Sequence, residues 1–426
     1  MAKNNKTVAN VPNMRFPGFS GDWETNKMGD LMTFKVTNSF SRDNLNYENG
    51  TVKNIHYGDI HTKFQTLFSI TNESVPYINE EINIDRISDE NYCKEGDLVF
   101  ADASEDLNDV GKSIEVLNIN NEKLLAGLHT LLARPKQNIF SLGFNGYLFK
   151  SNVVRKQIQK ESQGSKVLSI NVGRISKIKL SFPYIEEQKR IVSFLSLVDS
   201  RINTQNKIIQ SLESLMFGLV QDIFTQKLRF KNDDGNEFPE WELMKLGNVS
   251  DVRDGTHDSP KYRKEGFPLV TSKNLTKYGE ILFDEVNLIS KEDYETFNKR
   301  SKVNIGDILF GMIGTIGNPV IVNCEGFSIK NVALIKQKES LLNSFLIYVL
   351  NSEIISKQFH LLNTGGTQKF IALGVIRGLM IPTPSIEEQN KISNFLSSIN
   401  KKIEKEKVLL KEYEQQKKYL LQNLFI

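Results

Sequence analysis

The sequence predicts an α+β protein with two globular domains that are related by an approximate two-fold rotation and separated by an antiparallel two-helix coiled coil. Three observations predict this fold class. Similar segments occur twice in the same order, each copy ends in a long stretch with heptad spacing, and the segment before each stretch mixes strand and helix patterns. A chain of 426 residues is long enough for two or more domains.

Three segments carry the repeat: a Trp-Glu-x-x-Lys start, a Gly-Asp pair before three hydrophobic residues, and an Ile-Glu-Glu-Gln segment. They lie at Trp23–Lys27, Gly96–Phe100 and Ile185–Gln188 in the first copy, and at Trp241–Lys245, Gly306–Phe310 and Ile386–Gln389 in the second. The separation between matching residues falls along the chain, as loops of different length would cause. Two copies of one unit are therefore predicted.

Each copy ends in a predicted long helix, because apolar residues recur at alternating steps of four and three. One polar residue falls at the same seam position in both copies, Gln205 and Glu406, and Lys417 weakens the second seam where the first has Met216. The predicted seam comprises Ile191, Leu195, Val198, Ile202, Ile209 and Leu212, and then Ile392, Leu396, Ile399, Ile403, Leu410 and Leu420.

A helix with such a seam needs a partner, and the nearest one is its own twin. If the two helices run antiparallel, Phe425–Ile426 should lie near Met14–Phe16, whose counterpart Leu228–Phe230 follows closely after the first helix. The sequence thus predicts a nearly circular arrangement in which the end of the chain meets its beginning.

These patterns give four predicted parts. The first domain spans residues 1–184, the first helix 185–226, the second domain 227–385 with a linker at 227–240, and the second helix 386–426. Within the domains we expect strands at Gly96–Phe100, Gly306–Phe310 and Pro319–Val322 and helical structure over roughly Leu341–Leu361. Ser385 and Glu388 predict a capping box for the second helix.

The bulk composition indicates a soluble cytoplasmic protein. The net charge of +3 permits nucleic-acid binding without arguing for it. No apolar run approaches the roughly 20 residues of a membrane span, and the start is too polar for a secretory signal. Cys93 and Cys324 occupy unmatched places in the two copies, which argues against a disulfide framework or a cysteine-rich metal site.

No catalytic set is evident in the sequence. Gly311–Gly317 has neither the G-x-G-x-x-G spacing of a dinucleotide-binding loop nor the Gly-Lys-Ser/Thr ending of a P-loop. It predicts a tight turn after a strand. No Pro-Pro pair is present, which a DNA amino-methyltransferase would need in its base-binding loop. His61 and His257 each lie close to an aspartate, but a hydrogen-bonding or DNA-contact role fits them better than a metal site.

Several polar loops combine Lys, Arg, His, Tyr, Ser, Thr, Asn and Gln, which are residues that contact phosphates and base edges. Ordinary surface loops would have the same composition, and composition alone leaves both interpretations open. The candidate residues are Lys53, His61, Thr62, Lys63, Ser165, Lys166, Thr256, His257, Lys261, Tyr262, Arg263, Thr271, Ser272, Lys273, Asn274, Thr367, Gln368 and Lys369.

Taken together and in order, these segments resemble the DNA-specificity (S) subunits of Type I restriction–modification systems over essentially the whole chain. The resemblance is carried by the three duplicated segments, by Asp254–Tyr262 and by the turn Gly314–Gly317. The first copy differs: it has Tyr57–Lys63 where we expect the counterpart of Asp254–Tyr262, and Ala101–Ser104 in place of the glycine turn. The two copies should therefore recognise different DNA sequences.

The resemblance implies a non-catalytic subunit whose two target recognition domains each read one half of a bipartite site in double-stranded DNA. It implies helices that set the spacing and dock two methyltransferase (M) subunits, which would bind S-adenosylmethionine, and motor-endonuclease (R) subunits, which would use ATP and Mg²⁺. This chain itself would bind no cofactor and no metal. The competing hypotheses are a stand-alone DNA-modifying enzyme and a coiled-coil adaptor without a nucleic-acid role.

Overall fold

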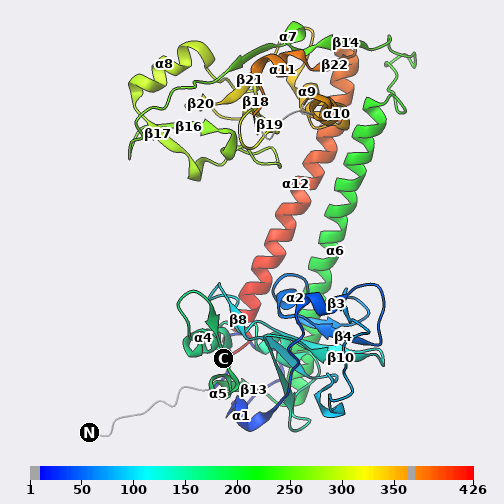
Figure 1. Ribbon diagram of the computed structural model, residues 1–426, viewed down its shortest axis with the longest axis vertical. Coiled ribbons are helices and arrows are strands. Elements are labelled where there is room, and N and C mark those ends of the chain that lie inside the picture. Colours follow the sequence, from blue (N-terminus) through cyan, green and yellow to red (C-terminus); the bar gives the residue numbers. More distant parts are fainter. Residues whose placement is uncertain (1–9, 363–369) are drawn as a thin grey trace. The chain divides into compact units, whose positions relative to one another are not determined.

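The computed structural model describes residues 10–362 and 370–426, which fold into two compact units. Unit 1 comprises Met1–Asn206 with Leu409–Ile426, and unit 2 comprises Lys207–Val408. Two long helices, α6 (Ile185–Phe224) and α12 (Ile386–Asn423), contribute to both units (Figure 1).

The described part of unit 1 is built around two sheets. The larger has the order β2 (Met32–Lys35), β11 (Thr130–Pro135), β7 (Leu98–Ala101), β9 (Ser113–Asn118), β5 (Leu67–Ser69). The smaller has the order β10 (Lys123–Ala126), β4 (Val52–Ile55), β6 (Tyr77–Ile78), β3 (Leu45–Asn46). Two further strand pairs are β1 (Glu24–Lys27) with β13 (Lys179–Phe182) and β8 (Ala103–Ser104) with β12 (Leu168–Ser169). The helices are α1 (Met28–Leu31), α2 (Tyr57–Thr62), α3 (Phe144–Leu148), α4 (Asn152–Glu161), α5 (Val172–Ile175) and the 3-10 turns η1 (Arg42–Asn44) and η2 (Asp89–Asn91).

Unit 2 has the corresponding sheets. One has the order β15 (Asp251–Asp254), β21 (Val332–Lys336), β18 (Ile308–Gly311), β19 (Gly317–Ile321), and the other β17 (Asn287–Ile289), β16 (Phe267–Thr271), β20 (Ser328–Lys330). β14 (Glu242–Lys245) pairs with β22 (Met380–Thr383). The helices are α7 (Leu246–Val249), α8 (Lys291–Ser301), α9 (Asn343–Leu350), α10 (Glu353–Leu362), α11 (Leu373–Gly378) and the 3-10 turns η3 (Ser272–Asn274) and η4 (Phe283–Glu285).

The two units share one topology. The strands β2, β11, β7 and β9 correspond to β15, β21, β18 and β19, and within each set of four the paired strands are antiparallel. In the other sheet β4 pairs parallel with β10 and antiparallel with β6, as β16 does with β20 and β17. This agreement confirms the repeat and the α+β fold class that the sequence predicts.

The duplicated Gly-Asp segment has the same structural role in both units. The Asp97 carboxylate pairs with Arg134 at 2.6 Å, and that of Asp307 pairs with Lys336 at 2.7 Å. Each carboxylate also accepts a 2.8 Å bond from the backbone N–H three residues before it. Because a buried carboxylate needs such partners, these pairs fix the strand that follows.

The Ile-Glu-Glu-Gln segment attaches each long helix to its own unit. The side chains of Gln188 and Gln389 each bond one backbone N–H and two backbone carbonyls of nearby loops. The glutamate before each glutamine is buried and pairs with an arginine, Glu187 with Arg15 and Glu388 with Arg229. The segment that helped to reveal the repeat is thus structural.

Within each unit, one end of α6 packs against the opposite end of α12. In unit 1, Asp199 pairs with Lys417 at 2.5 Å and Arg201 lies over the Tyr413 ring. In unit 2, Glu213 pairs with Lys407 at 3.0 Å. As the residue number increases along α6, the number of its contact partner in α12 decreases, so the helices are antiparallel, as predicted. All twelve predicted seam residues are buried or half-buried, and so are Gln205 and Glu406.

The end of the chain meets its beginning inside unit 1. The Met14 N–H donates to the Asn423 carbonyl at 2.9 Å, and Phe425 packs in the same core as Phe16. In unit 2 the corresponding bond, from the Leu228 N–H to the Asp222 carbonyl, measures 3.0 Å and joins residues that are close in sequence. The predicted circular arrangement is therefore confirmed.

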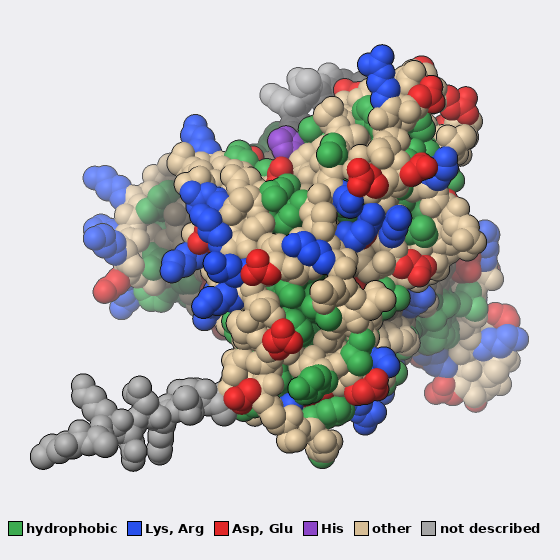
Figure 2. Space-filling model, turned by 90° about the horizontal axis from the view of Figure 1, so that it is seen from below, with side chains coloured by type: hydrophobic (Ala, Val, Ile, Leu, Met, Phe, Trp, Pro, Cys, Tyr) green, Lys and Arg blue, Asp and Glu red, His purple; other side chains and the backbone are tan. Residues whose placement is uncertain are grey.

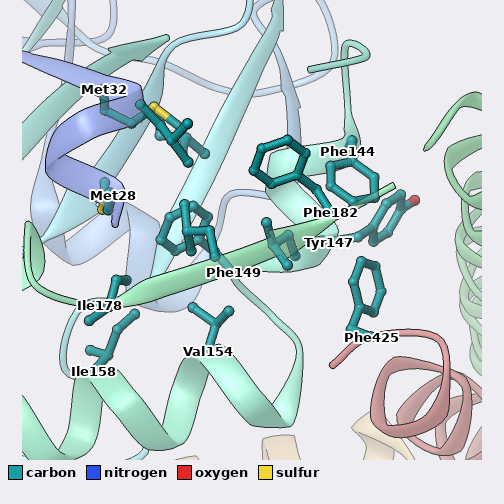
Figure 3. Packing of buried hydrophobic residues seen from close by; sticks show 14 of the residues in the cluster. Met28, Met32, Phe144, Tyr147, Phe149, Val154, Ile158, Ile178, Phe182 and Phe425 are labelled. Atoms are coloured by element: carbon teal, nitrogen blue, oxygen red, sulfur yellow. The ribbon is translucent and has the colours of Figure 1, made fainter. Parts of the chain in front are cut away.

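The main core of unit 1 joins its larger sheet to α3, α4, β13 and the ends of the two long helices. Figure 3 shows Phe144 and Tyr147 near Phe182 of β13 and Phe149 against the same strand, with Val154 of α4 also pointing to it. Phe425 closes this core from the end of α12, and its ring centroid lies 5.8 Å from that of Phe144. The segment that precedes α6 and the ends of the long helices in unit 1 therefore share one hydrophobic core, which resists their separation.

The helical structure expected over Leu341–Leu361 is confirmed. It consists of two helices, α9 and α10, because the Ser352 N–H and hydroxyl both bond the Val349 carbonyl and break the helical ladder. One local prediction was wrong. The capping box at Ser385 is only half formed. Its hydroxyl accepts from the Glu388 N–H at 3.3 Å, but the Glu388 carboxylate pairs with Arg229 instead of returning to the cap.

Candidate nucleic-acid interface

In unit 2, three polar loops converge on Ser272 and Asn331. The Ser272 hydroxyl donates to the Asn331 carbonyl at 3.0 Å and accepts from the Met312 N–H at 3.1 Å. The Asn331 side chain reaches a His257 ring nitrogen at 2.8 Å. Gly255 lets the loop after β15 lie against β20, because a Cβ there would lie 2.3 Å from the Ile329 carbonyl oxygen. The loops after β15, β16 and β18 therefore form one surface.

A buried carboxylate orients two cationic side chains on this surface. Asp254 is 7% exposed, and its oxygens contact a His257 ring nitrogen at 2.9 Å and the Arg300 guanidinium. Hydrogen bonds with Asp254 and Asn331 raise the pKa of His257 above its ordinary value. His257 and Arg300 remain mostly exposed, so a held imidazole and guanidinium face solvent together.

Unit 1 uses the same device with different residues. Asp59 is 1% exposed, and Arg42 donates to both of its oxygens at 2.9 Å. Lys63 reaches the same carboxylate at 3.1 Å and the Tyr47 hydroxyl at 3.1 Å. Burial alone would raise the pKa of Asp59, but the bonds from Arg42 and Lys63 outweigh it and hold the pKa below its usual range. The carboxylate thus fixes two exposed cations.

Three histidines surround Tyr57 in unit 1: the ring centroids of His56, His61 and His129 lie 4.7, 6.2 and 5.4 Å from that of Tyr57. His61 contacts the Ala103 carbonyl at 3.0 Å instead of Asp59. No group of residues in the described part of the chain has the composition of a metal site. The cluster is therefore an aromatic surface beside the cations that Asp59 holds.

The structure sorts the candidate residues by exposure. Ser272 and Asn274 are buried with internal partners, and Thr271 bonds Asn274, so these three shape the surface. Lys53 is half-buried between Glu122 and the Tyr77 ring. Thr367, Gln368 and Lys369 lie outside the described residues. The exposed candidates are Thr62, Lys63, Ser165, Lys166, His257, Lys261, Tyr262, Arg263 and Lys273, while His61 and Thr256 are half-buried.

The structure corrects the expected correspondence between two loops. Tyr57–Lys63 follows β4, whose counterpart is β16, so it corresponds to Ser272–Asn274 and not to Asp254–Tyr262. Asp254–Tyr262 follows β15, the counterpart of β2. The two loops look similar in sequence only because each places a histidine near an aspartate.

A family model for the type I restriction modification DNA specificity domain matches the chain twice, at residues 20–214 and 239–415. The chain belongs to this family. It is a DNA sequence-recognition subunit of the type I restriction–modification specificity family, and by family such a specificity subunit is non-catalytic. The two matched regions contain the exposed candidate residues of both units.

Two relatives come from Methanocaldococcus jannaschii. A putative type I restriction enzyme MjaX specificity subunit is 27% identical over 94% of this chain and 92% of its own length. The MjaVIII specificity subunit is 28% identical over 65% of this chain and 68% of its own length. The crystal structure of a type I S subunit from M. genitalium shares the fold, with a TM-score of 0.57 and 12% identity over 98% of this chain and 99% of that one.

A second solved structure shares the fold at the same TM-score of 0.57, with 15% identity over 96% of this chain and 97% of that one. It is described as concerning complex assembly and conformational transition of the type I R-M system. In the described part of this specificity subunit, no helix combines the length and apolarity that a membrane span requires.

Several residues of the interface escaped sequence analysis. Arg42, Arg300 and Asn331 belong to segments far from the loops that they join, and nothing in their local sequence marks them. Figure 2 shows why charge gave no signal either, since Lys and Arg side chains are interspersed with Asp and Glu over the face that it displays. The cationic groups of the specificity subunit are positioned by tertiary contacts and not by runs of charge.

Proposed function

We propose that each unit reads one half of a bipartite, asymmetric DNA site. One observation carries this proposal: a single scaffold occurs twice, and each copy holds a buried aspartate that orients a different pair of exposed groups. Asp59 holds Arg42 and Lys63 in unit 1, and Asp254 holds His257 and Arg300 in unit 2. Two unlike surfaces on like scaffolds suit two unlike half-sites.

The proposed contacts divide by chemistry. Exposed Lys and Arg side chains, such as Lys63, Lys166 and Lys273, suit phosphates, which set position and affinity. Side chains that donate or accept in fixed directions, such as His257 and Tyr262, suit base edges. The buried aspartates limit the movement of the cations that they hold, so less side-chain entropy is lost when DNA binds.

We also propose that α6 and α12 set the distance between the half-sites and dock two methyltransferase subunits. Large apolar side chains on these helices face solvent, including Leu197, Leu215, Phe217 and Val408. Exposed apolar groups of this size suit a protein partner. The partner subunits would bring S-adenosylmethionine, and motor-endonuclease subunits would bring ATP and Mg²⁺.

The recognition proposal is tested by mapping N6-methyladenine in cells that express the chain with its methyltransferase. We expect Lys261→Ala/Tyr262→Ala to relax or weaken one half of the methylated motif and leave the other half intact. Removal of one base-edge interaction should cost about 1–3 kcal/mol at its position. Lys291→Ala, an exposed residue of α8, serves as the matched control. Equal damage to both half-sites would contradict independent reading.

The docking proposal is tested by co-purification with the methyltransferase subunit. Leu215→Glu should reduce recovery of the complex, because it places a charge in an apolar contact. Ser214→Glu, at the neighbouring exposed position, adds the same charge and should leave recovery unchanged. If both variants assemble like the wild type, this part of α6 does not dock the methyltransferase.

A further inference from the structure

Each unit contains a cleft at the same place in the repeat. It lies between the long helices and the globular part of the unit, which is residues 15–183 in unit 1 and 229–384 in unit 2. In unit 1 a cleft of about 420 Å³ lies between α4 and the C-terminal part of α12. In unit 2 a cleft of about 460 Å³ lies beside α9, with α6 and α12 contributing residues. Ile202 and Glu414 line the first, and their repeat counterparts Ile403 and Glu213 line the second.

The two clefts differ in chemistry at equivalent positions. Lys417 and Lys418 line the cleft of unit 1 where Met216 and Phe217 line that of unit 2. Lys150, which follows α3, likewise stands where Asn351 follows α9. The scaffold is common to both, so the fold does not require positive charge there. We call the cleft in unit 1, lined by Lys150, Asn152, Arg155, Lys417 and Lys418, the basic cleft.

Few carboxylates neutralise the basic cleft. Lys417 pairs with Asp199 at 2.5 Å, whereas Lys150, Arg155 and Lys418 make no ion pair with the described residues. Glu414 is the acidic side chain in the lining, and it too makes no ion pair with them. Arg155 instead donates to three backbone carbonyls, those of Asn108, Val110 and Gly111, at 2.6 to 3.0 Å. The cleft therefore keeps a surplus of positive charge.

The start of helix α4 adds to this positive potential. Asn152 is the first of its ten residues and lines the cleft, and Ser151 caps the helix by accepting from the Val154 N–H at 3.4 Å. Free backbone N–H groups at a helix start attract anions, and the helix dipole acts in the same direction. The first residue of α4 and two lysines of α12 line the same cleft, so positive charge from two elements surrounds it.

The pKa of Lys150 indicates that nearby carboxylates, including Asp109, offset the positive charge around it only in part. Burial, followed by the positive charges of Lys112, Arg155 and Lys417, lowers the pKa of Lys150 to about 7. A bound anion would reverse this effect and favour the charged amine. Lys112 also donates to the His61 carbonyl at 2.6 Å, which connects the vicinity of the cleft to helix α2 of the candidate interface.

We infer that the basic cleft of unit 1 binds a phosphate group, held by Lys150, Lys418 and the start of α4, with Arg155 fixing the wall. Converging cations and backbone N–H groups match the several oxygens of a phosphate. The phosphate belongs to the backbone of bound duplex DNA or is free in solution. The DNA source rests on the proposed function of unit 1. We expect no phosphate in the cleft of unit 2, where Lys407 pairs with Glu213 and Glu404.

Amine labelling of the full wild-type chain tests this inference without any substitution. At pH 7.5 the chain is treated with an acylating reagent, and modification of Lys150 and Lys418 is measured by mass spectrometry against Lys411, an exposed lysine of α12 outside the cleft. We expect several-fold protection of Lys150 and Lys418, with Lys411 unchanged, when duplex DNA or inorganic phosphate is added at constant ionic strength. Protection by DNA alone identifies the DNA backbone, and protection by inorganic phosphate identifies the free anion. No protection by either overturns the inference.

A double variant, Lys150→Gln/Lys418→Gln, separates this inference from the proposed function. If DNA supplies the phosphate, the slope of log K against log salt should fall by about 0.9 for each phosphate that the variant no longer neutralises, while sequence preference is kept. Lys411→Gln should leave the slope unchanged. Suppose that the wild-type chain binds its DNA normally, the double variant keeps the same slope, and neither lysine is protected from labelling. These results would refute phosphate binding in the basic cleft without contradicting the proposed DNA recognition. Failure of the wild type to prefer any sequence would instead refute recognition.

Discussion

The two units of this specificity subunit hold themselves together in the same way and present different surfaces. Asp97 and Asp307 make matching buried pairs, and Gln188 and Gln389 make matching loop contacts. The exposed groups are unmatched. The duplicated motifs therefore encode the scaffold, and under the proposed function the unmatched loops determine what each unit recognises.

The largest expected effect comes from breaking what the units share. Asp97→Ala and Asp307→Ala each remove a buried carboxylate and leave the half-buried Arg134 or Lys336 without its partner. Removing one partner of such a pair costs about 3–5 kcal/mol. Chemical denaturation should show the loss, and the exposed Asp284→Ala serves as the control. Losses below about 1 kcal/mol in both variants would show that these pairs do not stabilise the scaffold.

The next largest effect is expected from the long helices, because they connect the two units and, in our proposal, set the distance between the half-sites. Inserting one heptad into α6 and one into α12 lengthens each by about 10 Å. We expect the methylated motif to keep both half-sites and to require a longer spacer. Methylome sequencing provides the measurement. Retention of the original spacer would contradict the role of the helices in setting the distance.

A smaller effect is expected from releasing the held cations of one unit at a time. Asp59→Asn should free Arg42 and Lys63, and Asp254→Asn should free His257 and Arg300. Each variant should weaken binding to its own half-site by roughly 10-fold, since one charge-assisted bond is worth about 1.5–3 kcal/mol. Competition with oligonucleotides altered in one half-site measures the effect. If either variant affects both half-sites equally, the units do not read separately.

The smallest expected effect is a pH dependence that belongs to unit 2. The pKa of His257 is raised by Asp254 and Asn331, with the Arg300 charge acting in the opposite direction. The stabilisation from this raised pKa is fully present below the unfolded-state value and is lost as pH rises through the folded-state value. DNA affinity should fall over the same window, and His257→Gln should remove the dependence. In contrast, the pKa of His56 in unit 1 is lowered by burial and by Arg42, so its contribution runs in the opposite direction and stability is lost as pH falls.

Much of the fold could be predicted from the sequence, because it depends on periodic or duplicated patterns. Seam residues such as Ile191 and Ile392 follow the heptad rule, and the contact between Met14 and Asn423 follows from antiparallel helices. The break between α9 and α10 could not be predicted, because it depends on which backbone carbonyl the Ser352 hydroxyl reaches. A local side-chain bond leaves no periodic trace.

Less of the interface could be predicted. The loop at Asp254–Arg263 was identified from its composition, but Asn331 and Arg300 reach it only through tertiary structure. Ser272 and Asn274 have the composition of DNA-contacting residues, yet both are buried and bond the backbone. Composition indicates which groups are polar, whereas burial decides which of them can meet a ligand.

One exchange tests the central claim that each unit reads DNA by itself. In a chain where Arg15–Pro183 is replaced by a second copy of Arg229–Pro384, both ends of the helix pair would carry the recognition segment of unit 2. Sequencing of methylated adenines should then reveal a symmetric motif made of two inverted copies of one half-site. A folded, methyltransferase-bound chimera that keeps the original asymmetric motif would contradict the account.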